Sequence, residues 1–402
     1  MKFCVLTSRL LSVALLGLIS FVHPLQAGDT GVLDTTGKRK QIRIGVITQR
    51  NGPHLGIYFP AIANCESVAD VAIVDNSGTT FASAKKMLGV HADFKPYRDA
   101  AVMIAEFRPH LVLVALAANR APAPIRAALS AGCHVLAEKP ACVRAEDFRP
   151  LVQLATDKGV NLMLALPSRL APDTLRAKEI VDAGWIGKPF GVTFFQVKDQ
   201  ARLTGADYQK SWFAFREQAG GGHLIWLGIH NLDQVFFITN DRVEKVTGFA
   251  NNVGGQPVKI EDAEAVAFQF RSGMVGTFHG GYYLEGGSYQ AGTTLWGSRG
   301  WIKLAGYRGP DGSRRSFQWY STHPDAPRGV QTENETPAVN SYQLLVQAAI
   351  DTARGARPPI LTGNDCLHVL EVIFGAYRAS ETGVSQTLFQ NQPDSQPRSP
   401  SR

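Results

Sequence analysis

The chain lacks the features that mark several functional classes. Charged residues make up only 19% of its 402 residues, and no run of five or more basic residues accompanies the net charge of +7. This argues against nucleic acid as a partner. The five cysteines follow no disulfide framework, and we expect those beyond Cys4 to be small core residues. Cysteine, histidine and carboxylate residues form no cluster with metal-ligand spacing, so we predict no metal.

The longest apolar run lies near the N-terminus, over residues 10–22. It follows Lys2 and Arg9 and precedes a small-residue cleavage site that ends at Ala27, which is the pattern of an export signal. The run is too short to span a bilayer comfortably. We therefore predict a cleaved signal peptide over 1–27, a periplasmic or extracellular protein, and no stable membrane anchor. Arg9 stands alone, so the twin-arginine pattern for export of folded proteins is missing.

The first half of the remaining chain alternates short apolar runs with stretches of helical periodicity. Apolar residues make up 45% of the chain, enough for a sizeable core, and the length favours two domains. This alternation predicts a Rossmann-type, doubly wound parallel sheet over 40–166. The expected strands are 42–47, 71–75, 111–116, 134–138 and 161–166, and the expected helices are 57–66, 79–89, 98–107, 121–132 and 144–158.

From residue 167 the pattern changes to a helix at 171–184 followed by several runs with strand character. This predicts an α+β domain over 167–388 with an open, mostly antiparallel sheet. The polar, proline-rich tail, 389–402, is expected to be disordered. The expected strands are 190–197, 243–250, 265–270, 273–283 and two around a Ser-Arg-Gly turn within 293–306, and the closing helices are 340–355 and 364–378.

A parallel sheet of this kind commonly binds a nucleotide at the carboxyl ends of its strands. The turn after the first strand contains no G-x-G-x-x-G, and only Gly52 and Gly56 stand near the start of the next helix. Asp75 ends the second strand, where it could bind both ribose hydroxyls of an adenosine or serve as a turn or capping residue. In the first case its charge would favour NAD over NADP.

The strand at 134–138 ends in Glu138-Lys139-Pro140, which places a lysine at the carboxyl edge of the sheet. Here the chain resembles the glucose-fructose oxidoreductase/inositol dehydrogenase (Gfo/Idh/MocA) family, whose hallmark is this tripeptide. The resemblance covers nearly the whole chain after the signal. Five segments carry it in the family's order: "APIRAALSAGCHVLAEKP", "IVDAGWIGKPFGV", "AGGGHLIWLGIHNLD", "IEDAEAVAFQF" and "RPPILTGNDCLHVLEVIFGAYRASETG".

The resemblance implies oxidation or reduction of sugars, polyols or related compounds with NAD or NADP, and a homo-oligomer that uses the open sheet. It implies that Lys139, with Glu138 beside it, holds the cofactor and the substrate hydroxyl, although a lysine there could also be a surface charge. His230 occupies the position of the family's acid/base histidine. The alternative is that His230 is a buried structural residue.

The same resemblance exposes departures. If residues 219–230 are helical, His223, Trp226 and His230 share one face, and Trp226 stands where the family has an aspartate. We assign His223, Trp226 and Trp212 to substrate binding. Thr48 replaces the first glycine of the phosphate loop. In the turn after the fourth strand, only Asn119 matches the family pattern. We assign Thr48, Gly52, Gly56, Asp75 and Asn119 to cofactor binding, together with Glu138 and Lys139.

Three functional hypotheses follow. The first is an exported NAD(P)-dependent oxidoreductase with Lys139 and His230 as catalytic residues. The second is a glycosidase or lyase that uses bound NAD as an internal redox relay, which suits a compartment without a nucleotide pool. The third is a carbohydrate-binding or assembly protein in which Trp226 fills the former catalytic hollow.

Overall fold

The computed structural model describes residues 40–286, 289–305, 317–333 and 339–388. The expected signal peptide and the expected disordered tail lie outside these residues. Among the described residues, no helix is long and apolar enough to cross a membrane. The cysteines within them, Cys65, Cys133, Cys142 and Cys366, are all unpaired thiols, and all but Cys65 are buried.

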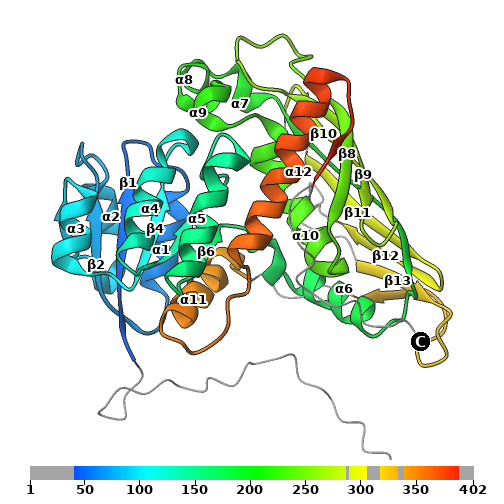
Figure 1. Ribbon diagram of the computed structural model, residues 1–402, viewed down its shortest axis with the longest axis horizontal. Coiled ribbons are helices and arrows are strands. Elements are labelled where there is room, and N and C mark those ends of the chain that lie inside the picture. Colours follow the sequence, from blue (N-terminus) through cyan, green and yellow to red (C-terminus); the bar gives the residue numbers. More distant parts are fainter. Residues whose placement is uncertain (1–39, 287–288, 306–316, 334–338, 389–402) are drawn as a thin grey trace, which may run out of the picture.

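The N-terminal half forms the expected doubly wound parallel sheet, with the strand order β3-β2-β1-β4-β5-β6. The order reverses between β1 and β4, which is the switch point at which such sheets bind ligands. Helices cover both faces of the sheet (Figure 1). The strands are β1 (Ile42–Thr48), β2 (Val68–Val74), β3 (Lys95–Tyr97), β4 (Leu111–Ala115), β5 (His134–Ala137) and β6 (Leu162–Leu164). The helices are α1 (Leu55–Ala63), α2 (Phe81–Met87), α3 (Ala100–Phe107), α4 (Pro122–Ser130) and α5 (Ala145–Asp157).

The C-terminal half contains a nine-stranded sheet in the order β14-β13-β12-β11-β7-β10-β9-β8-β15. Only the β10–β7 pair is parallel, so the prediction of an open, mostly antiparallel sheet is confirmed. The strands are β7 (Pro189–Asp199), β8 (Val243–Asn251), β9 (Ala263–Phe270), β10 (Val275–Leu284), β11 (Tyr289–Gly297), β12 (Gly300–Ala305), β13 (Phe317–Ser321), β14 (Gln331–Glu333) and β15 (Gln386–Thr387).

Helices cover one face of this second sheet. They are α6 (Pro172–Asp182), α10 (Ile229–Thr239) and α12 (Gly363–Thr382), which lie between the two sheets in Figure 1. The other face exposes Phe195, Phe249, Val275 and Trp296. This uncovered apolar surface is available for the expected oligomer contact, which stays a prediction.

The final helices connect the two halves. Helix α11 (Ser341–Ala353) packs against α1, and α12 contacts both α5 and β8. A capping box formed by Thr362 and Asp365 begins α12, and Gly383, with a φ of 71°, ends it. The C-terminal segment therefore returns from the second sheet to the first half of the chain. Helix α12 then contacts elements of both halves.

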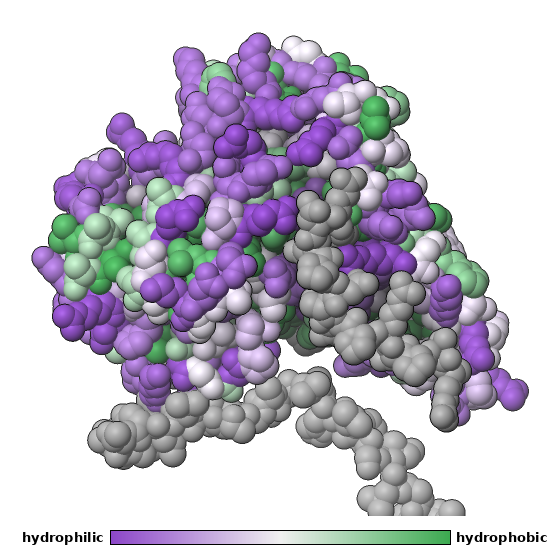
Figure 2. All heavy atoms as spheres, viewed as in Figure 1, coloured by the Kyte–Doolittle hydropathy of each residue, from purple (hydrophilic) through white to green (hydrophobic). Residues whose placement is uncertain are grey.

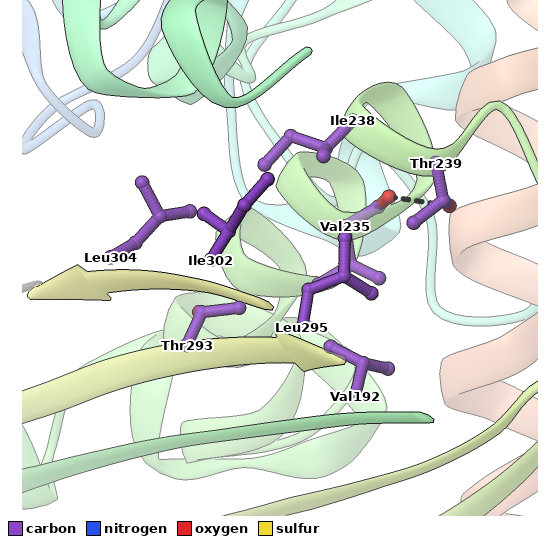
Figure 3. Close-up of a pocket in the computed structure, with 8 residues that line it drawn as sticks. All are labelled: Val192, Val235, Ile238, Thr239, Thr293, Leu295, Ile302 and Leu304. Carbon is purple, nitrogen blue, oxygen red and sulfur yellow. Dashed lines mark hydrogen bonds between the residues drawn. The ribbon is translucent and has the colours of Figure 1, made fainter. Parts of the chain in front are cut away.

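Hydrophilic residues cover most of the face shown in Figure 2, and apolar residues of the described part of the chain lie there in small groups. Inside the second half, a small cavity of about 10 Å³ lies between α10 and the sheet (Figure 3). Apolar side chains and two threonines line it, and it holds one water at most. This cavity cannot accept a sugar or a nicotinamide. Its lining residues are Val192, Val235, Ile238, Thr239, Thr293, Leu295, Ile302 and Leu304.

A buried ion pair joins the start of the second half to α10. Arg169, on the short 3₁₀ helix η3 (Pro167–Leu170), donates to Asp233 through Nη2 at 2.7 Å and through Nε at 2.9 Å. Both side chains are buried. Burial outweighs the charge of Arg169 and raises the pKa of Asp233 above its usual value. Such a pair costs desolvation energy and needs both partners.

We expect Asp233→Ala to lower the free energy of unfolding by about 3–5 kcal/mol, because it removes the buried carboxylate that binds Arg169 and leaves that guanidinium only the partly exposed carboxylate of Asp365, 3.7 Å away. Urea denaturation followed by circular dichroism measures this. Arg144→Ala, which removes the exposed Arg144–Asp147 pair, serves as the control and should leave the midpoint unchanged. An Asp233→Ala midpoint equal to that of the wild type would contradict the structural role of the pair.

Candidate active site

Lys139 lies just beyond β5, at the carboxyl edge of the parallel sheet, and is almost fully buried. Its Nζ donates a hydrogen bond of 2.6 Å to the backbone carbonyl of Trp226 in the second half of the chain. The same nitrogen lies 4.3 Å from the centroid of the Trp226 ring and 4.0 Å from Oε1 of Glu138. The lysine is therefore part of the contact between the two halves, and not a surface charge.

This environment changes the ionisation of the lysine. Burial lowers the pKa of Lys139 to about 8, the charge of Glu138 opposes that change, and the charge of Arg202 adds to it. An amine with a pKa near neutrality can change its protonation state within the physiological range. Lys139 is thus suited to hold or transfer a proton.

Trp226 lies on a π-helical turn, η5 (Leu224–Gly228), that leads directly into α10. Its Nε1 donates to the carbonyl of Ala219 at 3.2 Å, and its ring packs edge-on against Phe213 and Trp212 at centroid distances of 4.8 and 5.4 Å. The indole of Trp226 cannot replace the carboxylate of the aspartate that the family has at this position. The backbone carbonyl of the same residue instead provides the acceptor for Lys139.

His230 lies in the first turn of α10 and is half-buried. Within the described residues, its buried Nδ1 has no hydrogen-bond partner. Burial lowers the pKa of His230 well below its usual value, and the charges of Lys139 and His54 lower it further. The imidazole is consequently neutral near pH 7, with a nitrogen free to accept a proton.

A second group at this site was not predicted from the sequence. The hydroxyl of Tyr58 donates to Oε2 of Glu138, and Nδ1 of His54 lies 3.1 Å from the same oxygen. Tyr342, from α11, packs against the rings of both His54 and Tyr58. His54 is the N-cap residue directly before α1 and has a left-handed backbone, and Tyr58 lies in the first turn of that helix. Their partner Glu138 could be found only from the fold.

The structure separates His223 from this group. His223 is fully buried, its Nδ1 lies 2.5 Å from Oε1 of Glu264, and its ring packs edge-on against Tyr282. The predicted single stripe of His223, Trp226 and His230 assumed the period of an α-helix. The π-helical turn between these residues has a wider period, so the stripe is interrupted. The substrate-binding role of His223 stays a prediction.

Glu261 fixes the start of the same turn. Its carboxylate accepts hydrogen bonds from the amides of Gly222 at 2.6 Å and Leu224 at 3.1 Å, and from the hydroxyl of Tyr377 at 2.6 Å. Burial raises the pKa of Glu261 to about 7, and the nearby charge of Glu264 adds to this. Gly222 has no room for a side chain, because a Cβ there would lie 1.9 Å from the carbonyl oxygen of Glu261.

The turn after β1 lies at the switch point of the parallel sheet. Thr48 donates through Oγ1 to the carbonyl of Ala115 at 3.0 Å, which joins the ends of β1 and β4. Gly52 packs so closely that a Cβ would lie 2.1 Å from that Oγ1, whereas a Cβ on Gly56 would meet nothing within 4 Å. Gly52 therefore makes the tight turn, and Gly56 leaves open space beside the first turn of α1.

Asp75 is fully buried at the end of β2. Its carboxylate accepts hydrogen bonds from the amides of Ser77 at 2.9 Å and Thr80 at 3.0 Å, and from the Ser77 hydroxyl at 2.8 Å. Burial acts to raise the pKa of Asp75, but these hydrogen bonds outweigh it and hold that pKa below its usual value. The structure thus shows the turn role that the sequence allowed, and the ribose contact stays a prediction.

The remaining predicted positions border this region. Asn119 is exposed on the 3₁₀ helix η2 (Ala118–Arg120), directly after β4. Trp212 is partly buried on η4 (Trp212–Ala214), where it stacks on Phe213. Across the described ranges, no three histidine, cysteine or acidic residues are grouped so that they could hold a metal ion.

Taken together, a doubly wound sheet, a buried lysine at its carboxyl edge and a neutral histidine from a second domain define a two-domain oxidoreductase of the dinucleotide-binding class. Comparison with known families agrees. Residues 55–166 match the oxidoreductase family with an NAD-binding Rossmann fold, and residues 174–303 match the GFO/IDH/MocA C-terminal domain. The chain belongs to the Gfo/Idh/MocA family.

Relatives of known activity share modest identity with the chain. A 1,5-anhydro-D-fructose reductase from Ensifer adhaerens is 25% identical over 264 residues, covering 65% of this chain and 74% of that protein. A myo-inositol 2-dehydrogenase from Thermotoga maritima is 23% identical over 330 residues, covering 79% and 90%. These relatives carry names of enzymes that act on sugar-like compounds.

Solved structures share the fold. Levoglucosan dehydrogenase in complex with NADH superposes with a TM-score of 0.76 at 17% identity, covering 88% of this chain and all of that one. An aldose-aldose oxidoreductase from Caulobacter crescentus gives a TM-score of 0.71 at 22% identity, covering 87% of this chain and all of that one. At these identities the likeness establishes architecture alone.

Proposed function

We propose that this chain is an exported NAD(P)-dependent oxidoreductase that acts on a sugar, a polyol or a sugar derivative by hydride transfer. The observation that carries the proposal is the pairing of a buried, titratable Lys139 with a neutral His230 at the carboxyl edge of the parallel sheet. An apolar side chain at either position would pack as well as Lys139 or His230 does. Both provide what the oxidation of an alcohol needs, which is a fixed cation and a proton acceptor.

In this proposal the two side chains have different roles. The Lys139 ammonium binds the substrate hydroxyl oxygen and stabilises the negative charge that develops on it. The free Nδ1 of His230 accepts the hydroxyl proton during oxidation and returns it during reduction. The nicotinamide, when bound, accepts or supplies the hydride. The Trp226 ring lies beside the lysine, and the partly buried Trp212, which packs against that ring, would contact a sugar ring.

The residues around the switch point fit a dinucleotide. Gly56 leaves open space next to the backbone at the start of α1, where a diphosphate can approach closely. The depressed pKa of Asp75 keeps a negative charge at the end of β2, and that charge would repel a 2′-phosphate. We therefore favour NAD over NADP.

A second candidate function follows from the predicted export signal at the N-terminus. A compartment reached by export lacks a pool of free NAD, so a nucleotide held through the whole cycle would serve better there. In that case the chain is a glycosidase or lyase that oxidises a sugar transiently, eliminates a neighbouring bond and returns the hydride. The same Lys139 and His230 would serve it.

The first test is the nucleotide content of protein purified from its native host. We expect mass spectrometry to find released NAD, and added NAD to raise the melting temperature. Trp226→Asp should then lower turnover about tenfold or more, because it removes the ring at the lysine, while Trp226→Phe keeps an aromatic ring and most of the activity. Higher turnover of Trp226→Asp would instead identify a decayed dehydrogenase. No nucleotide and no thermal shift would exclude both enzyme proposals.

The second test is the pH dependence of alcohol oxidation. Because the pKa of Lys139 is lowered to about 8, its cationic form is lost as the pH rises through that value, and kcat/KM should fall above about pH 8. The pKa of His230 is well below its usual value, so no acidic limb should occur near the ordinary histidine pKa. Lys139→Arg keeps its charge and should abolish the alkaline fall. A wild-type kcat/KM that rises through pH 8 would identify the neutral amine as the active form.

The third test concerns export. Intact mass analysis of protein from the periplasm or medium should give a mature chain that begins at Gly28. Leu15→Arg, which places a charge in the apolar run, should leave uncleaved precursor in the cytoplasm, whereas Leu15→Val should be processed as the wild type is. A wild-type chain that keeps Met1 and stays in the cytoplasm would remove this part of the proposal.

A further inference from the structure

We propose that Arg120 binds the diphosphate of the dinucleotide and replaces part of the backbone cradle that a glycine-rich turn provides. This inference rests on the proposed function and adds a residue to its nucleotide site. It starts from a contact across the switch point of the parallel sheet. Nη1 of Arg120, on the loop after β4, donates to Oε1 of Gln49, on the loop after β1, at 2.9 Å.

Two positions of the turn after β1 offer no amide to an anion. The Gly52 amide is used inside the turn, where it donates to the carbonyl of Gln49 at 2.9 Å, and Pro53 has no amide hydrogen. Asn51 and His54 adopt left-handed backbone angles, with φ of 55° and 58°, in place of glycines. A diphosphate therefore finds no free amide at Gly52 or Pro53, within the stretch where a G-x-G-x-x-G turn presents backbone donors.

Arg120 is placed to supply the missing interaction. Gln49 is buried and accepts a hydrogen bond from one nitrogen of the guanidinium, while Arg120 as a whole is exposed. Its other N–H groups remain available to a ligand, and a guanidinium fork matches phosphate oxygens. Helix α9 (Arg216–Ala219) of the second half packs against η2, the element that carries Arg120. The guanidinium thus lies where the two halves meet over the switch point.

The inference predicts a charge-dependent nucleotide affinity. Isothermal titration calorimetry with NADH and with ADP-ribose, which keeps the diphosphate but lacks nicotinamide, measures it on the full-length mature protein. Arg120→Gln should weaken both ligands about 10- to 100-fold, the value of a charge-assisted hydrogen bond pair. It should also reduce the dependence of Kd on ionic strength. Arg120→Lys keeps the charge but not the forked guanidinium. Its affinity for both ligands should lie between those of the wild type and of Arg120→Gln.

Arg126→Gln is the matched control, because Arg126 is exposed on the neighbouring helix α4 and carries the same charge. It should bind both ligands as the wild type does. Gln49→Met, which frees the guanidinium from its anchor, should weaken binding less than Arg120→Gln. Melting temperatures of all variants, measured without ligand, verify folding.

The outcomes separate the two proposals. If the wild type binds NADH and ADP-ribose but Arg120→Gln binds both within twofold of it, Arg120 is a surface residue paired with Gln49 and the inference fails alone. If Arg126→Gln is weakened as much as Arg120→Gln, the effect is general electrostatics and the inference also fails. If the wild type binds neither ligand, the proposed function fails and the inference fails with it.

Discussion

The site depends on one hydrogen bond, from the Lys139 ammonium at the edge of the first sheet to the Trp226 carbonyl in the second half of the chain. A buried cation needs an acceptor, since an uncompensated charge in the interior costs several kcal/mol. Meeting that requirement fixes where the π-helical turn lies relative to β5. Because this turn continues into α10, it also fixes His230. The two groups that we assign to chemistry therefore reach the same place through one constraint.

That constraint is maintained from a third region of the chain. Glu261, just before β9, holds the amides that begin the π-helical turn, and Tyr377 of α12 donates to the same carboxylate. Helix α12 in turn packs against α5 of the first half. The geometry at Lys139 thus depends on hydrogen bonds between residues that are 39 to 116 positions apart in the chain.

The sequence predicted the architecture because β-branched runs and helical periods are local signals. The missed strands β3, β13, β14 and β15 are short, and β3 contains a proline at the sheet edge. The site was predicted less completely. The quoted stretch "AGGGHLIWLGIH" contains a π-helical turn that an α-helical period cannot describe, so His223 was grouped with His230 and not with Glu264. Glu264, Glu261 and His54 are partners defined by tertiary packing, and no spacing in the chain indicates them.

Two departures from the family pattern, the missing aspartate and the missing glycines, have the same physical consequence. Without the aspartate, the Lys139 ammonium lacks its usual carboxylate partner. Without the glycines, the expected diphosphate lacks its usual backbone amide partners. The structure provides a carbonyl for the first, and we infer a guanidinium for the second. In a protein with no chemistry left at this position, an apolar side chain in place of Lys139 would avoid the desolvation cost and pack as well. The buried, fully accommodated lysine therefore favours an enzyme over a binding protein that merely keeps the fold.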